Sequence, residues 1–76
     1  MIIALQLAMK DELLKLEVRN KLYSLIFKSP GLHFREIQRR TKMATGQLTY
    51  HLEFLQKGNL VKKVADGQYL RYYADT

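Results

Sequence analysis

Cysteine and tryptophan are absent from this 76-residue sequence, and proline occurs once. Without cysteine the chain has no disulfide, no thiolate metal ligand and no cysteine nucleophile. Paired carboxylates, a nucleophile beside a base and a glycine-rich phosphate loop are missing as well, and so short a chain has little volume for a substrate pocket. The sequence therefore predicts no enzyme and no bound cofactor.

Long hydrophobic runs are also missing. The apolar opening, residues 1–9, is interrupted by Gln6 and ends at Lys10, whereas a bilayer-spanning helix needs about 20 apolar residues. The opening also lacks the basic start and small-residue cleavage site of a signal peptide. We expect a cytoplasmic chain that does not enter a membrane.

Charge of one sign prevails, with a net charge of +6 and a pI near 9.8. Between residues 33 and 73 the acidic residues are only Glu36, Glu53 and Asp66. The basic residues there are Arg35, Arg39, Arg40, Lys42, Lys57, Lys62, Lys63 and Arg71. This excess favours a polyanionic partner, although a basic surface can also serve solubility alone.

The spacing of apolar residues predicts an amphipathic helix over residues 10–28. Ser29-Pro30-Gly31 ends it, because proline cannot continue a helix. A short extended piece at 32–33 then leads into a helix of about two turns over 34–41, with Phe34 and Ile37 on its inner face.

A third helix is predicted over residues 45–57, after a tight connector. Thr45 is the expected N-cap, since its hydroxyl can accept from the free amides of the first turn. Leu48, Leu52 and Leu55 form one inward stripe. The opposite face carries Gln47, Thr49, Tyr50 and Glu53.

After Gly58-Asn59, which tolerate left-handed backbone, two β-prone runs flank Asp66-Gly67. Such a pair between β-prone runs is a strong hairpin signal. The predicted fold is therefore α+β, a single winged helix-turn-helix domain over residues 1–76, with three helices followed by a two-stranded β-hairpin wing.

This organisation predicts sequence-specific binding of double-stranded DNA in transcription regulation, because a third helix of this kind fits the major groove and base edges there carry a distinct pattern. The candidates for reading bases are Thr45, Gln47, Thr49 and Tyr50. The candidates for phosphate or wing contacts are Arg35, Arg39, Arg40, Lys42, Lys62, Lys63, Gln68 and Arg71. The alternative is a winged-helix protein-interaction module within a larger assembly.

Two stretches carry a family resemblance. Residues 29–37, and residues 47–55 followed by Leu60-Val61, resemble winged-helix transcriptional regulators of archaea and bacteria akin to the arsenical-resistance and multiple-antibiotic-resistance repressors. The resemblance covers about residues 16–73 and implies a dimeric, operator-binding regulator. Asn59 stands where the family usually has glycine. Metal-sensing members carry cysteine or clustered histidine ligands that this chain lacks, so no metal effector is expected.

The apolar opening has three interpretations: extra turns of the first helix, a β-strand, or a membrane-surface anchor. We favour a homodimer, with residues 1–15 extending the first helix as a dimerisation segment. The candidate seam residues are Ile2, Ile3, Leu5, Met9 and Leu13. His33 and His51 are expected to serve packing or hydrogen bonding, and a phosphate contact is the alternative for His51.

Overall fold

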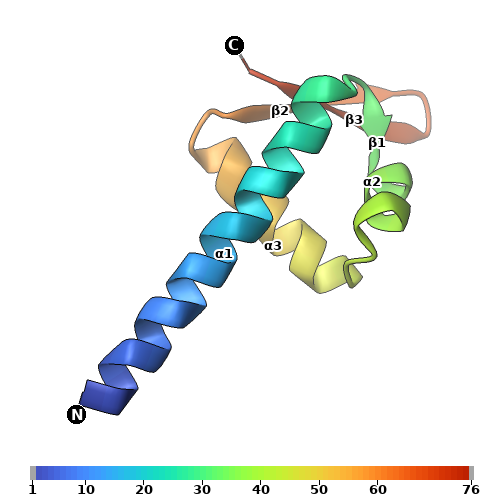
Figure 1. Cartoon of the computed structure of the whole chain (residues 1–76). Coiled ribbons are helices and arrows are strands. Elements are labelled where there is room, and N and C mark those ends of the chain that lie inside the picture. The colour runs from blue at the N-terminus through green and yellow to red at the C-terminus, as the bar shows by residue number, and fades with distance from the viewer. Residues whose placement is uncertain (1, 76) are drawn as a thin grey trace.

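Three helices and a small antiparallel sheet make up the chain (Figure 1). The computed structural model describes the backbone of residues 2–75 and the side chains of residue 10 and residues 12–75. Along the chain the order is α1 (Ile2–Lys28), β1 (Leu32–His33), α2 (Phe34–Thr41), α3 (Thr45–Lys57), β2 (Val61–Asp66) and β3 (Tyr69–Ala74). The predicted winged helix-turn-helix architecture is thereby confirmed.

The first helix is longer than the periodicity alone predicts, because it begins at Ile2 rather than near Lys10. The interpretation of the apolar opening as extra turns of this helix is confirmed, and the interpretation as a β-strand is wrong. The N-terminal half of α1 projects away from the other elements (Figure 1). In the part of the chain that the structure describes, no helix is long and apolar enough to cross a membrane.

The second helix begins with a reciprocal cap. Nδ1 of His33 accepts a hydrogen bond from the amide of Glu36 at 3.4 Å, and Oε1 of Glu36 accepts one from the amide of His33 at 3.4 Å. Two otherwise unpaired amides of the first turn are satisfied in this way. The expectation that His33 has a structural role is confirmed.

The third helix has the predicted bounds but a different cap. Ala44 is its N-cap, in extended conformation and without a side-chain hydrogen bond, and Thr45 is already helical. The prediction that Thr45 caps the helix is therefore wrong. Its hydroxyl oxygen instead accepts a hydrogen bond from Nε2 of Gln38, at 2.9 Å, which joins α3 to α2.

The sheet has the order β1-β3-β2, so the predicted hairpin gains a third, two-residue strand. Leu32 pairs with Tyr72, and Asp66 pairs with Tyr69, which leaves Gly67 and Gln68 as the turn. Gly67 has a φ of 61°, which glycine adopts at low cost. Asn59 has a φ of 59° at the end of α3, so it takes the left-handed geometry expected of it.

One apolar cluster joins all these elements. It contains the predicted leucine stripe of α3, and its buried members are Leu22, Ile26, Leu32, Ile37, Leu48, Leu52, Leu55, Val61 and Tyr72. Phe34, predicted to face inward, packs partly buried against it. Because α1 contributes Leu22 and Ile26 to this core, its C-terminal half is held against the domain.

His51 lies in the contact between α1 and α3. It is buried, and its Nδ1 accepts a hydrogen bond from Nε of Arg19 at 3.3 Å. The prediction of a packing or hydrogen-bonding role is confirmed, and the alternative of a phosphate contact is wrong because the ring is covered. Burial, followed by the positive charges of Arg19 and Lys15, lowers the pKa of His51 below its ordinary value of 6.5.

This lowered pKa predicts a pH-dependent stability. The unfolded chain binds the His51 proton more readily than the folded chain, so the contribution is complete above pH 6.5 and is lost as the pH falls toward the folded pKa. Urea unfolding at about pH 7.5 and about pH 5 should show a lower free energy of unfolding in acid. His51→Gln should reduce this difference, and an unchanged difference would contradict the assignment.

Candidate nucleic-acid interface

The outer face of α3 is exposed to solvent because the helix buries only its opposite face. Leu48, Leu52 and Leu55 point into the core, whereas Gln47 and Thr49 lie on exposed flanks. All four predicted base-reading residues, Thr45, Gln47, Thr49 and Tyr50, are exposed. The helix thus presents polar groups along its first two turns.

Gln38 of α2 fixes the start of α3. Its Nε2 donates to the backbone oxygen of Met43 at 3.2 Å and to the Thr45 hydroxyl at 2.9 Å. These two bonds span the turn between the helices and set the direction in which α3 leaves it. This role of Gln38 was not predicted from the sequence, because a bond across seven residues leaves no trace in helical periodicity.

Tyr50 is exposed but not free to turn. Nη2 of Arg19 donates to its hydroxyl at 3.4 Å, and the Arg19 guanidinium lies 3.5 Å from the centre of the Phe54 ring. The Lys15 ammonium lies 5.9 Å from the centre of the Tyr50 ring. Cations over aromatic rings attract them electrostatically. Of the predicted base-reading residues, Tyr50 is therefore also part of the contact between α1 and α3.

The tip of the wing lies against α2. The rings of His33 and Tyr69 stack with their centres 4.7 Å apart. Two shallow hollows, of about 480 and 460 Å³, are lined here by His33, Phe34, Arg35, Gln38, Arg39, Gln68, Tyr69 and Leu70. The structure thus brings together three predicted contact residues, Arg35, Arg39 and Gln68, from segments about 30 residues apart in the sequence.

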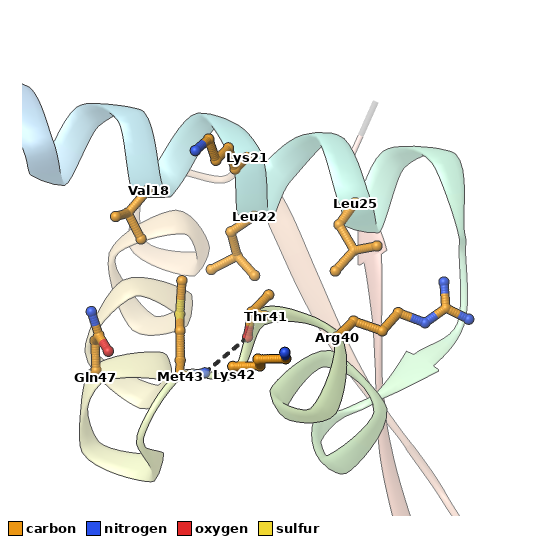
Figure 2. A pocket seen from close by; sticks show the side chains of 9 residues that line it. All are labelled: Val18, Lys21, Leu22, Leu25, Arg40, Thr41, Lys42, Met43 and Gln47. Carbon is orange, nitrogen blue, oxygen red and sulfur yellow. Dashed lines mark hydrogen bonds between the residues drawn. The ribbon is translucent and has the colours of Figure 1, made fainter.

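A second basic region lies on the other side of the turn between α2 and α3. Figure 2 shows a hollow of about 520 Å³ whose wall is formed by Val18, Leu22, Leu25 and Met43. Its remaining lining includes Arg40, Lys42 and Gln47, all predicted site residues, together with Lys21 of α1. Sequence reasoning missed Lys21, since only the packing of α1 brings it here.

The cations of the wing differ in their exposure and in the hydrogen bonds that they make within the domain. Lys62 and Lys63 are exposed on β2, opposite Tyr73 and Tyr72. Arg71 is half-buried and already bonded: its Nη1 donates to the backbone oxygen of Gly31 at 2.8 Å, and its Nε to Oδ2 of Asp66 at 2.8 Å. Arg71 therefore braces the wing against the segment before β1.

The seam candidates are only partly described. Leu13 is exposed on α1, whereas the side chains of Ile2, Ile3, Leu5 and Met9 lie outside the described residues. Among the described side chains, no cluster of three or more histidine, aspartate or glutamate residues could hold a metal ion.

Comparison with known proteins adds the family. Residues 16–76 match the sequence family described as HVO_0163, N-terminal HTH domain, where HTH stands for helix-turn-helix. The chain belongs to this family. An archaeal relative, the uncharacterized HTH-type transcriptional regulator MJ1398 of Methanocaldococcus jannaschii, is 34% identical over 64 residues. That alignment covers 84% of this chain and 16% of the relative, so the chain spans a small part of the relative's length.

The resemblance to archaeal winged-helix regulators is confirmed at this level, as an HTH domain with an archaeal HTH-type relative. Membership of the arsenical-resistance or multiple-antibiotic-resistance groups stays a prediction. The family match begins at residue 16, so the projecting first turns of α1 precede the matched HTH segment.

The turn of this HTH domain contains a strained residue. Lys42 ends α2 with a φ of 59° and a ψ of 25°, a left-handed conformation that costs a residue with a Cβ about 1–2 kcal/mol. Glycine would relieve that cost. The lysine is therefore not the residue that stability alone favours at this position.

Substitution of Lys42 tests this strain. Lys42→Gly should be more stable than Lys42→Ala by about 1 kcal/mol, because both remove the charge and only glycine adopts this backbone freely. Urea unfolding followed by circular dichroism measures the difference. Equal stability of the two variants would contradict a left-handed Lys42.

Proposed function

We propose that this HTH domain is the sequence-specific, double-stranded-DNA-binding part of a transcriptional regulator, with α3 in the major groove and the β2–β3 wing on the flanking backbone. The observation that carries the proposal is the exposed polar face of α3 between two groups of cations. Family membership and the HTH-type relative support it. The major groove, about 12 Å wide, admits one helix.

In this proposal, residues in the first turns of α3 contact the DNA bases. Gln47 carries an amide that matches the donor and acceptor pattern of adenine, and Thr49 can contact several bases. Both are exposed. We assign Tyr50 a supporting part, because its hydroxyl accepts a bond from Arg19 and a base contact has to preserve or replace that bond.

Phosphate contact falls to the cations on either side of the turn. Arg35 and Arg39 lie beside the wing tip, while Arg40 and Lys42 lie on the α1 side. A helix seated in a groove has a phosphate strand on each flank, so this division matches the two strands. Lys21 joins the second group, and Lys62 and Lys63 extend the basic surface along β2.

We further propose that the regulator acts as a homodimer on a two-fold symmetric site. A protein-interaction module is the competing assignment, and it predicts no duplex binding. Selection of bound sequences from a random duplex pool tests both. We expect a short enriched motif with palindromic symmetry, and absence of duplex binding at low salt would overturn the proposal.

Substitutions should separate base contacts from phosphate contacts. Gln47→Ala and Thr49→Ala should reduce the preference for the selected sequence, at a cost of about 1–3 kcal/mol for a bidentate base contact. Arg39→Ala and Lys62→Ala should weaken binding to all duplexes alike. Removal of one phosphate-binding cation should reduce the magnitude of the negative slope of log K against log salt by about 0.9.

Two controls sharpen this measurement. Lys28→Ala removes an exposed cation at the C-terminal end of α1, and it should leave the salt slope unchanged. Lys42→Gly and Lys42→Ala should weaken duplex binding equally, since they remove the same charge, although their stabilities differ. Fluorescence anisotropy with a labelled duplex at several salt concentrations provides the data. An equal loss of affinity from Lys28→Ala would contradict localisation of binding at the HTH turn.

A further inference from the structure

The helix α1 has a second apolar face beside the one buried in the core, and the domain covers this second face only near Tyr23, which packs partly buried against the core. Leu22 and Ile26 are completely buried in the core, whereas Leu13 is 59%, Leu16 53% and Phe27 55% exposed. We call the second face the outer stripe, made of Leu13, Leu16, Asn20, Tyr23 and Phe27. Leucine exposed to this extent along one helix face is typical of a surface that another molecule covers.

The spacing of the outer stripe is that of a helix-pairing seam. Its members follow one another at three, four, three and four residues, the heptad pattern by which two α-helices pack together. The same spacing continues toward the N-terminus at Met9 in the sequence. The ring of Phe27 stacks on that of Tyr23, with centres 6.1 Å apart, which fixes both rings near the end of the stripe.

Charges flank the outer stripe in a set order. Lys10 and Glu17 lie along one edge, and Glu12 and Arg19 along the other, as their positions in the heptad dictate. In an antiparallel pair each edge faces the same edge of the partner. Lys10 then meets Glu17 of the second copy, and Glu12 meets Arg19 of the second copy, each twice by symmetry.

We propose that a second copy of this chain packs antiparallel on the outer stripe, with Leu13 of each copy against Leu16 of the other. The four opposite-charge pairs occur in this register, in which the copies cross between residues 14 and 15. That crossing lies at the middle of the 27-residue helix, so the two α1 helices overlap along nearly their whole length. The N-terminal half of α1 projects away from the other elements (Figure 1), and Leu13 and Leu16 are more than half exposed.

The parallel alternative is less favourable. It sets Asn20 opposite the same residue of the other copy, where the two amides can bond, but it brings Glu12 against Glu17 twice. A parallel pair thus combines one amide bond with two like-charge repulsions. The antiparallel pair has two Lys10–Glu17 attractions, and it adds two contacts between Glu12 and Arg19, which already have the partners Lys15 and His51 within the chain. The direction of pairing therefore depends mainly on Glu17 and Lys10, which are both exposed, because Arg19 is already bonded to His51.

The inference rests on the proposed homodimer and gives it a surface and a direction. The seam predicted from the sequence contained Leu13, and the outer stripe extends it toward the C-terminus through Leu16 and Phe27. The two-fold axis of the pair is perpendicular to α1, and the two HTH bodies lie at opposite ends. Such a pair offers two recognition helices related by the same symmetry as a palindromic duplex.

The first experiment measures self-association of the 76-residue chain by sedimentation equilibrium. We expect a dimer, and Leu16→Glu should raise its dissociation constant about 100-fold or more, because each dimer then has two fewer buried leucines. Leu14→Glu is the matched control: Leu14 is 61% exposed but lies off the outer stripe, so its dissociation constant should stay within about threefold. Circular dichroism confirms that both variants fold.

The second experiment tests direction by charge. Glu17→Lys should weaken the antiparallel dimer, and adding Lys10→Glu should restore it, because the pair between residues 10 and 17 is rebuilt with reversed signs. In a parallel dimer Glu17→Lys removes a repulsion and strengthens association, which would overturn the proposed direction. A monomeric wild-type chain, or equal effects of Leu14→Glu and Leu16→Glu, would overturn the proposed surface.

These outcomes are independent of DNA binding. A chain that stays monomeric yet binds the selected duplex would overturn the dimer alone. A chain that dimerises as described but binds no duplex would overturn the proposed function and leave the dimer in place.

Discussion

The packing of the α3 leucine stripe against Leu22 and Ile26 of α1 is the interaction on which the remaining structure depends. Burial of each such side chain contributes about 1.5–3 kcal/mol, and this cluster holds most of the fully buried side chains in the described part of the chain. It decides which face of α3 is outward. The exposed face of α3, and everything proposed for it, exists because the opposite face is buried here.

Polar contacts then fix the relative orientation of the helices and the wing, which apolar packing alone does not determine. Arg19 joins α1 to α3 through His51 and Tyr50, and Gln38 joins α2 to the first residue of α3. Arg71 attaches the wing to the segment before β1. Because each bond is directional, the four bonds made by these three side chains together limit rotation and sliding of the elements that they join. Candidate reading and phosphate groups are thereby held on rigid elements.

Much of this fold was predictable because its signals are local. Pro30 ends α1, the leucine spacing defines α3, and Gly67 marks the turn of the wing. The cap of α3 was not predictable, because Thr45 bonds with Gln38 rather than with its own first turn. The pairing of β1 with β3 was not predicted for a similar reason. A strand of two residues, Leu32 and His33, shows no periodicity, and its partner strand lies about 40 residues away.

The candidate site shows the same difference between features set by local sequence and features set by contacts between distant segments. The exposure of Gln47 and Thr49 follows from helical periodicity, so their place on the outer face was predictable. The contacts of Arg71 and Tyr50 within the domain, and the position of Lys21 at the hollow that Arg40 also lines, depend on packing between segments distant in sequence. Charge counting treats all cations alike, whereas the structure separates those that brace the fold from those that face outward.

The size of the chain connects the two proposals. A domain of this length buries only about 60% of the surface that its unfolded form exposes, and α1 alone leaves three large apolar side chains of the outer stripe more than half exposed. Covering them with a second copy adds apolar burial that the small core lacks, and it stabilises the folded chain by mass action. In the proposed dimer one helix serves both needs: its inner face orients α3, and its outer face would join a second recognition helix to the first. A recognition helix with few base contacts gains specificity when two act on one site, because the second binding event then becomes intramolecular.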